Sequence, residues 1–334
     1  MATLFSLVLT KVAILLLCIA PISLSLTFKK IPLPTGATGP ASFAFDLFGG
    51  PYVGVQDSRI LKYEGPTTGF INVFFVGNLI DQVEAVCDGQ TNDSLGPTCG
   101  WPFGLDFNIL TQQLYVADAY FGLLVVGSNG RLGTILASGV NGTRFRFLNS
   151  VGLDPLIGVV YFTEFSVVYQ LSNITQVILN GDATGSLLKY DPKTRQVTVL
   201  LTRLFGAARV AVSANGAFVL VSEQIGQRIQ RFWIKGPKRN TTETFITFQG
   251  RPNKITRTGL GDFLVAVNVI TNQSTQNVLP TVVRINAFGT VVKRVALDRQ
   301  YNDTGVTEVI DHLGEYYIGS QYVNVTFVGV YGIL

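Results

Sequence analysis

One pattern recurs six times along this chain, roughly every 50 residues, and it limits the possible folds more than any other feature. Each copy has a short apolar strand, a polar turn, and an alternating apolar strand that ends in an acid or a polar residue. The copies are SFAFDLFGGPYVGVQD (42–57), GLDFNILTQQLYVAD (104–118), GLDPLIGVVYFTE (152–164), RVAVSANGAFVLVSE (209–223), KITRTGLGDFLVAVN (254–268) and EVIDHLGEYYIGS (308–320). Repeats of this kind are typical of propeller blades.

Most copies are followed by another short strand, which gives each repeat several antiparallel strands. These further strands are SRILKYEG (58–65), FGLLVVGSNG (121–130), GSLLKYDPKT (185–194) and QRIQRFWIKG (227–236). Alternating strands joined by Asn-Gly or Gly-rich turns are read as hairpins. The sequence therefore predicts an all-β fold, a six-bladed β-propeller.

The composition agrees with one large folded unit. Of the 334 residues, 47% are hydrophobic and only 14% are charged, which is too few charges for a disordered chain. Propellers run long as single units, so we expect one domain over residues 26–334. The net charge of +4 is spread along the chain with no basic cluster among aromatics, so nucleic-acid binding is not expected.

One segment has a helical period. In SVVYQLSNITQVIL (166–179), apolar residues recur at three- and four-residue spacing. They are Val168, Leu171, Ile174, Val177 and Ile178. We expect a short helical insertion near 166–179, in the fourth-strand region of one blade, where it would form a lid or rim at one end of the propeller.

The N-terminal 25 residues predict a signal peptide. A single charge, Lys11, precedes the apolar run VAILLLCIA (12–20), and Ser23 and Ser25 are small residues suited to a cleavage site. A retained membrane anchor is the alternative, because the usual positive N-terminal charge is lacking. No later segment is long and apolar enough to span a membrane once the signal is removed. These features predict a protein of the secretory pathway.

Removal of the signal would leave two cysteines, Cys87 and Cys99, in a loop rich in Gly, Asn and Pro. An even number in an oxidising compartment predicts one disulfide, with two free buried thiols as the alternative. The chain also carries seven N-x-S/T sequons, which predict surface loops and N-glycosylation. Their asparagines are Asn92, Asn141, Asn173, Asn240, Asn272, Asn302 and Asn324.

Several long segments resemble the strictosidine synthase family of plants. They are VQDSRILKYEGPTTGF (55–70), QLYVADAYFGLLVVG (113–127), GVVYFTE (158–164), GSLLKYDPKTRQVTVLL (185–201) and FVLVSEQIGQRIQRFWIKGPKRNTTETF (218–245). The resemblance covers about residues 28–334, and the CDG…TCG pair at Cys87 and Cys99 matches the family's disulfide. It implies a six-bladed propeller of alkaloid-type secondary metabolism with no cofactor. It also implies a vacuolar location, with the endoplasmic reticulum or the cell exterior as alternatives.

The family's named reaction is the Pictet–Spengler condensation of tryptamine with the aldehyde secologanin, a carbon–nitrogen lyase activity. One glutamate does the acid–base work, which needs a carboxylate in a partly apolar pocket. When His312, Gly314 and the YIG at 317–319 are aligned without a gap, that glutamate falls on Thr307. Glu308 is one residue away, and one step along a strand reverses the face of a side chain. Glu308 would be catalytic only if the loop before it carried a compensating deletion.

The resemblance also places a ligand pocket. Where the synthases have large aromatics around the indole, this chain has Phe147, Asn149 and Gln224, so only Phe147 keeps an aromatic ring. This weakens the case for tryptamine but not for another amine or aldehyde.

Arg209 begins an inner strand and could place a cation in the channel, which would favour an anionic small-molecule ligand. The alternative is a structural ion pair with Asp154 or Glu223.

Related propellers hydrolyse lactones and phosphotriesters with a channel calcium, which needs six or more oxygen ligands. Here Ala41 replaces the glutamate of the usual GPES, and Ala208 stands where an asparagine is expected. Asn149 and Asn253 are neutral donors only. We therefore expect no metal site.

The remaining candidates have structural interpretations. The single histidine, His312, has no second metal ligand or nucleophile to work with and is expected to hydrogen-bond in a turn. Asp118, Glu164 and Glu223 end equivalent strands, where acids usually cap backbone amides. Three functions stay open: a strictosidine synthase-like enzyme of unknown substrate, a non-catalytic propeller that binds a small ligand or partner, and a hydrolase. We expect a monomer.

Overall fold

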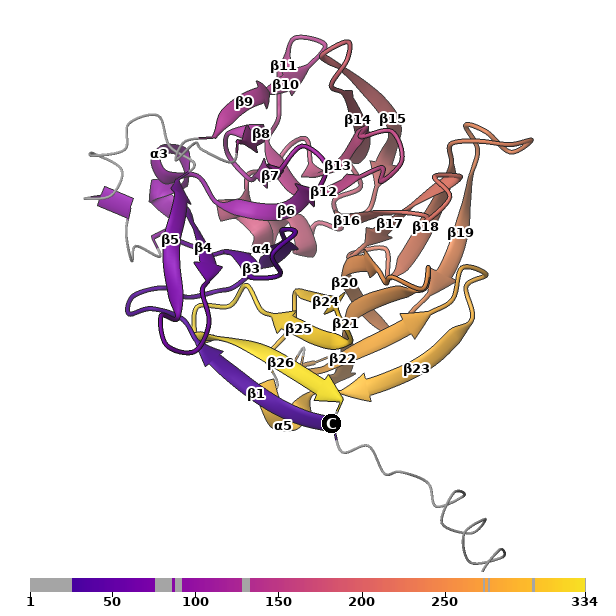
Figure 1. The fold of residues 1–334 in the computed structure, drawn as a ribbon. Coiled ribbons are helices and arrows are strands. Elements are labelled where there is room, and N and C mark those ends of the chain that lie inside the picture. The colour runs from indigo at the N-terminus through magenta and orange to yellow at the C-terminus, as the bar shows by residue number, and fades with distance from the viewer. Residues whose placement is uncertain are drawn as a thin grey trace, which may run out of the picture.

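The computed structural model describes residues 26–75, 86–87, 92–127, 133–272, 274–275, 277–301 and 304–333. Within these residues, six four-stranded antiparallel sheets surround a common axis (Figure 1). The predicted six-bladed β-propeller is confirmed. The expected signal peptide at 1–25 and the sequon at Asn302 lie outside the described residues.

Five blades are built from consecutive strands. The first has β2 (Ser42–Phe45), β3 (Pro51–Gly54), β4 (Arg59–Tyr63) and β5 (Phe70–Phe75). The second has β6 (Pro102–Asn108), β7 (Gln113–Asp118), β8 (Gly122–Val126) and β9 (Thr134–Ala137). The third has β12 (Phe147–Leu153), β13 (Val160–Ser166), β14 (Gly185–Asp191) and β15 (Gln196–Leu204). The fourth has β16 (Ala207–Val212), β17 (Phe218–Glu223), β18 (Arg228–Trp233) and β19 (Thr242–Thr247). The fifth has β20 (Gly250–Arg257), β21 (Phe263–Asn272), β22 (Asn277–Ile285) and β23 (Val291–Ala296).

The sixth blade closes the ring by joining the two ends of the chain. Its strands are β24 (Glu308–His312), β25 (Glu315–Gly319), β26 (Phe327–Ile333) and β1 (Leu26–Pro32). β1 pairs antiparallel with β26 over its whole length, with Phe28 opposite Tyr331 (Figure 1). The N-terminal strand thereby covers the edge that β26 would otherwise leave open.

A few short elements lie outside the blades. They are η1 (Asp93–Leu95), α3 (Gly96–Cys99), β10 (Gly139–Val140), β11 (Thr143–Arg144), η2 (Leu171–Asn173), α4 (Ile174–Leu179) and α5 (Asp298–Tyr301). Of these, η2 and α4 form the predicted helical insertion. It lies between β13 and β14, the second and third strands of its blade, and not in the fourth-strand region that the sequence suggested. It also begins later than 166, because the Ser166 hydroxyl accepts the amides of Val168 and Tyr169 and holds those residues in a turn.

The innermost strands β2, β6, β12, β16, β20 and β24 contact one another in sequence around the axis. They run in the same direction. Near their starts, the Leu105 amide donates to Ser42 Oγ, while near their ends Phe45 stacks on His312 at 3.9 Å. The blade-to-blade connections therefore share one face, the crossover face, which also holds the turns between second and third strands. The opposite face, the turn face, holds the turns between first and second strands and between third and fourth strands.

The hydrophobic core fills the layers between adjacent blades. Leu220 of β17, Ile255 of β20 and Val265 of β21 are fully buried in one such layer. Between the first and sixth blades, Val53 and Val328 are buried in the same way. The alternating pattern of the repeats thus places one apolar face of every sheet against its neighbour.

Candidate functional site

Three charged side chains from different blades meet inside the channel. The Arg209 Nη2 of β16 lies 2.9 Å from Glu308 Oε1 of β24, and the Lys254 Nζ of β20 lies 3.8 Å from Glu308 Oε2. The Arg209 side chain is 6% exposed, and those of Lys254 and Glu308 are 0% exposed. Together with Ser42 of β2, we call these residues the charged layer.

Backbone and hydroxyl groups complete the charged layer. Glu308 Oε2 accepts the amide of Phe43 at 2.9 Å, which ties the sixth blade to the first. Arg209 Nη1 lies 3.4 Å from Ser42 Oγ, and Nη2 lies 3.5 Å from the carbonyl of Leu105. A single carboxylate is therefore neutralised by groups from several blades.

Lys254 is held in the same way. Its Nζ donates to the carbonyl of Ala41 at 2.6 Å and to the carbonyl of Phe103. Burial lowers the pKa of Lys254 to about 7, the charge of Glu308 raises it, and the charge of Arg209 lowers it further. Two carbonyls and a nearby carboxylate are the partners that a buried ammonium requires.

A second acid, Asp106 of β6, accompanies these charges. Burial raises the pKa of Asp106 to about 6, although the Leu153 amide and the charge of Arg209 lower it. The Leu153 amide donates to its Oδ2 at 2.7 Å. Asp106 thus joins the second blade to the third, and its carboxyl group interacts electrostatically with Arg209.

One residue nearer the crossover face, every inner segment contributes a neutral side chain. We call this set the mouth layer, and its members are Ala41, Phe103, Asn149, Ala208, Asn253 and Thr307. In four blades this residue lies where the register of the inner strand shifts, at Phe103, Asn149, Ala208 and Asn253. Bulges of this kind re-aim a side chain and are common beside functional sites.

Thr307, which the ungapped match predicts to stand at the position of the family glutamate, belongs to the mouth layer. Its Oγ1 accepts the amide of Gln321 at 2.8 Å, and its carbonyl accepts the amide of Lys254 at 3.0 Å. Glu308 is one residue deeper and is committed to the charged layer. The structure thus places no carboxylate in the mouth layer.

An apolar cluster covers the mouth layer on the side of the second, third and fourth blades. Its buried members are Trp101, Phe103, Ala119, Phe147, Phe165, Leu171, Val177 and Ala208. Phe147 is 1% exposed, with its ring centroid 5.7 Å from Phe103 and 5.1 Å from Phe165. Leu171 and Val177 come from η2 and α4, so the insertion lies over this end of the channel as expected.

The other residues that the sequence predicts for the ligand pocket lie at the edges of this cluster. Asn149 is 3% exposed, and its Oδ1 has no hydrogen-bond partner among the described residues. The same holds for the indole Nε1 of Trp101. Gln224 follows β17 on the crossover face, where its amide donates to the carbonyl of Gly206. An unpaired acceptor and an unpaired donor are thus buried beside aromatic rings.

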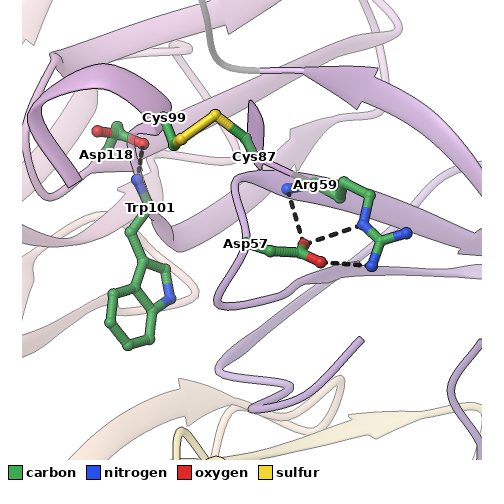
Figure 2. The surroundings of a disulfide bond; sticks show 6 residues. All are labelled: Asp57, Arg59, Cys87, Cys99, Trp101 and Asp118. Carbon is green, nitrogen blue, oxygen red and sulfur yellow. Dashed lines mark hydrogen bonds and ion pairs between the residues drawn. A yellow bond between two sulfur atoms is a disulfide. The ribbon is translucent and has the colours of Figure 1, made fainter. Parts of the chain in front are cut away.

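The predicted disulfide joins Cys87 and Cys99, whose Cα atoms lie 5.7 Å apart. Figure 2 shows it between the Asp118–Trp101 contact and the Asp57–Arg59 pair, with the Trp101 indole pointing away from it. Cys99 ends α3 and is followed within two residues by Trp101, whose amide donates to Asp118 Oδ2 at 2.7 Å. The disulfide therefore anchors the segment that delivers Trp101 and Phe103 to the mouth.

The acids that end equivalent strands cap backbone amides, as the sequence suggested. Asp118 accepts three amides, Glu164 accepts that of Arg146, and Glu223 accepts that of Phe205. Burial raises the pKa of Asp118 and of Glu164 to about 7, against the opposing effect of these amides.

Two sequence alternatives are settled by geometry. Arg209 pairs with neither Asp154 nor Glu223, but with Glu308 across the channel. His312 stacks on Phe45 at 3.9 Å, and its Nε2 has no hydrogen-bond partner among the described residues. The hydrogen bond expected of His312 in this turn is therefore not formed by Nε2, and the imidazole ring stacks on Phe45 instead.

The channel residues do not fit a calcium ion. Calcium needs several anionic oxygens, whereas Glu308 is already paired with Arg209 and faces Lys254. Asn149 and Asn253 offer only neutral oxygens. Among the described residues, no group of three or more His, Cys, Asp or Glu side chains converges. Two buried cations would also repel a divalent ion from this end of the channel.

Sequence reasoning missed three residues of this site. Asp106 is the one acid in the inner strand PFGLDFN, and that charge was the available signal, whereas Lys254 stands among other polar residues in GRPNKITR and gave none. Trp101 follows the TCG of Cys99 directly and is one of only two tryptophans in the chain.

Comparisons with known proteins agree with this architecture. The strictosidine synthase family matches residues 149–237. The chain is 39% identical over 298 residues to Protein STRICTOSIDINE SYNTHASE-LIKE 11 of Arabidopsis thaliana, covering 89% of each chain. It is 32% identical over 307 residues to strictosidine synthase of Catharanthus roseus, covering 91% of this chain and 86% of that one.

Solved structures share the fold at low identity. A gluconolactonase of Xanthomonas campestris matches with a TM-score of 0.66 and 10% identity, over 92% of this chain and 90% of that one. A calcium-binding regucalcin of Agrobacterium tumefaciens matches with a TM-score of 0.63 and 11% identity, over 92% and 94%. At these identities the likeness concerns the propeller alone.

Six four-stranded blades, closed by the pairing of β1 with β26, define a six-bladed β-propeller. By sequence, the chain belongs to the strictosidine synthase-like family.

Within the described residues, no helix has the length and apolar character of a membrane span.

Proposed function

We propose that this protein binds a small, largely apolar ligand at the mouth of its channel and does not perform the glutamate-driven condensation of its family's namesake. One observation carries the proposal: the mouth layer holds Thr307 at the matching position, while the nearest acid, Glu308, is paired with Arg209. A general acid or base must touch the substrate and exchange its proton. A substrate would have to displace both Arg209 and the Phe43 amide to reach Glu308.

The lining of the mouth suggests the ligand's chemistry. Phe147 and Phe103 offer apolar surface, while Trp101 Nε1 and Asn149 Oδ1 are buried without partners. A ligand with an apolar body, one acceptor and one donor would satisfy both groups, and leaving them unpaired costs roughly 1–3 kcal/mol each. Aromatic amines and monoterpene aldehydes, the two halves of the namesake reaction, are the first probes to try.

The condensation assay tests the catalytic half of the proposal. Purified protein is incubated with tryptamine and secologanin, alongside Glu308→Gln, and product is measured by mass spectrometry. We expect no enzymatic product from either protein. Enzymatic product from the natural protein would overturn the proposal, and its disappearance in Glu308→Gln would assign catalysis to Glu308 if circular dichroism shows that the variant is folded.

Calorimetry tests the binding half. Tryptamine, other aromatic amines and secologanin are titrated separately into the natural protein and into Asn149→Leu, which removes the unpaired acceptor and keeps a similar volume. A probe that binds should lose on the order of tenfold in affinity with Asn149→Leu. Equal affinity in both proteins would place the ligand elsewhere.

We also propose the secretory pathway, with the vacuole as the first destination to examine. The apolar N-terminal segment and the pairing of Cys87 with Cys99 support this location. The six sequon asparagines within the described residues are all exposed, which suits N-glycosylation. Treatment of the expressed protein with an N-glycosidase should shift its mass, and fluorescence microscopy of a tagged chain tests the compartment.

A further inference from the structure

Large apolar side chains stand exposed at the tips of the turns between first and second strands. All six turns lie within the described residues. Five of them carry at least one exposed large apolar side chain, and the turn of the fourth blade carries Ala214 instead. The side chains are Leu47 (66% exposed), Phe48 (84%), Ile109 (50%), Leu110 (87%), Leu156 (61%), Ile157 (55%), Leu260 (86%) and Leu313 (91%). Single exposed leucines are ordinary, but their repetition at equivalent tips of one face is not.

The turns form one ring around the axis. A Cβ at Gly49 of the first blade would lie 3.4 Å from His312 Nε2 of the sixth. Similarly, a Cβ at Gly261 of the fifth blade would lie 3.9 Å from Ala214 of the fourth. These two pairs of turns lie close together, and the inner strands that lead into all six turns contact one another in order around the axis. The exposed side chains therefore share the surface around the channel's end on the turn face.

Polar residues at the base of the turns hold the backbone, so the apolar tips have no part in shaping it. Asp46 Oδ1 accepts the amides of Phe48 and Gly49, and Asn108 Oδ1 accepts the amide of Leu110 at 3.1 Å. Turns stabilised in this way are rigid supports. The tips are therefore displayed outward at little further cost in conformational entropy.

The third blade repeats this arrangement, whereas the turn of the fourth blade carries Ala214 and has no large apolar tip. Asp154 Oδ1 accepts the amides of Leu156 and Ile157. On the same face, the outer turns of these two blades carry exposed basic residues. They are Lys193, Arg195, Lys235, Lys238 and Arg239. Acids pair with two of the bases on this face: Glu64 pairs with Lys62 at 3.1 Å, and Glu243, directly after the outer turn of the fourth blade, pairs with Lys238 at 2.9 Å.

The two faces differ in their predicted glycans. Of the six described sequons, five lie on the crossover face or its connections, at Asn92, Asn141, Asn173, Asn272 and Asn324. Only Asn240, in an outer turn, lies on the turn face. Glycans would keep the crossover face in water and leave the centre of the turn face uncovered.

The chain also enters the propeller at the turn face. β1 begins there at Leu26, beside the end of β26 (Figure 1). The residues before Leu26 include the apolar run VAILLLCIA at 12–20. If that run were a retained anchor, it would therefore lead from a membrane to the turn face.

We propose that the turn face is a docking surface for a lipid bilayer. The apolar tips enter the boundary between headgroups and acyl chains, and the basic outer turns face anionic headgroups. Separate apolar tips with polar backbone between them suit shallow insertion into lipid. A protein interface would be expected to have a contiguous apolar core inside a polar rim. Docking on this face leaves the ligand mouth open to water on the other.

Vesicle flotation tests the proposal with the full-length chain secreted from a eukaryotic host. The vesicles contain phosphatidylcholine with or without phosphatidylserine. A tip variant carries Phe48→Ser, Leu110→Ser, Leu260→Ser and Leu313→Ser. A matched control carries Val168→Ser, Leu179→Ser, Tyr322→Ser and Val323→Ser, which remove exposed apolar side chains from the crossover face.

The natural protein and the control should float with the vesicles, more strongly when phosphatidylserine is present. The tip variant should partition on the order of a hundredfold more weakly. All three proteins share one N-terminus, so a difference cannot arise from residues 1–25. If the tip variant does not fold, Lys193→Glu with Arg195→Glu replaces it and should abolish the effect of phosphatidylserine.

Three results would overturn the proposal. The natural protein could fail to float, or the tip variant could float as well as the control. Light scattering could also show a dimer that the tip substitutions convert to a monomer without any vesicle binding, which would make a second copy the occupant of this face.

Discussion

In the first, fourth, fifth and sixth blades, a residue of the charged layer lies one step along the chain from a residue of the mouth layer, yet the two layers differ in charge and in hydrogen bonding. The charged layer holds Arg209, Lys254 and Glu308 together, buried and one residue deeper in the channel. The mouth layer is neutral and lies beside an aromatic cluster with unpaired polar groups. The comparison teaches that two adjacent residues of one inner segment, Thr307 and Glu308, can have quite different surroundings, since Glu308 joins blades through buried charges and Thr307 does not.

The largest expected effect comes from breaking the charged layer. Glu308→Gln removes the charge that neutralises Arg209 and faces Lys254, and should lower the free energy of unfolding by about 3–5 kcal/mol. Urea unfolding of the purified protein measures this change. The double variant Glu308→Gln with Lys254→Met should recover part of the loss, since one of the two buried cations is gone. A loss below about 1 kcal/mol in Glu308→Gln would show that the layer is not a buried ion network.

The disulfide is expected to matter nearly as much, and its effect should reach the mouth layer. Replacing Cys87 and Cys99 together by serine should cost about 3 kcal/mol, because the cross-link restricts the unfolded chain. Thermal unfolding with and without a reductant measures the loss in the natural protein. The variant should be insensitive to the reductant. A thiol assay confirms that the reductant has opened the disulfide. An unchanged unfolding temperature of the natural protein after that reduction would contradict the expectation.

Much of this architecture could be predicted from the sequence. The six repeats gave the blades, because alternation along paired strands reports directly which side chains enter the core. The cysteine pair and the capping acids Asp118, Glu164 and Glu223 also followed from local pattern. The closing strand β1 could not be foreseen, since its partner β26 lies at the other end of the chain.

The charged layer was the harder part of the site. Arg209 was assigned two candidate partners near in sequence or in equivalent positions, and it pairs with neither. The bulges at the starts of the inner strands decide which cation pairs with which carboxylate across the channel. A bulge cannot be recognised reliably in a single sequence. Lys254 looked like one polar residue among several in a strand, and only its complete burial makes it notable.

Mild acidity should stabilise the folded protein, because three of its buried carboxyl groups have raised pKa values. The pKa values of Asp106, Asp118 and Glu164 are raised by burial, to about 6, 7 and 7. The folded state therefore binds more protons than the unfolded state between about pH 4 and pH 7, and stability is lost as the pH rises through that window. The pKa of Lys254 is lowered to about 7, so its ionisation changes the stability only above about pH 7, where stability rises with pH.

We therefore expect the free energy of unfolding to be higher at pH 5 than at pH 7, by on the order of 2 kcal/mol. Urea unfolding across this range measures the slope. Asp118→Asn keeps an acceptor for the capped amides but cannot titrate, so it should flatten the slope. A steeper slope in Asp118→Asn, or stability that rises from pH 5 to pH 7, would contradict the assignment.

The smallest effect is expected at Thr307, and it completes the comparison with Glu308. Thr307→Val removes the acceptor of the Gln321 amide while preserving the shape of the side chain, and should cost about 1 kcal/mol in unfolding free energy. Thr307→Ser keeps the acceptor and serves as the control, with a smaller loss. Both variants should leave the charged layer intact, so the pH dependence of unfolding should match that of the natural protein. A loss at Thr307 as large as that at Glu308→Gln would mean that the two layers form a single structural unit, and the division of the channel into a scaffold and a mouth would fail.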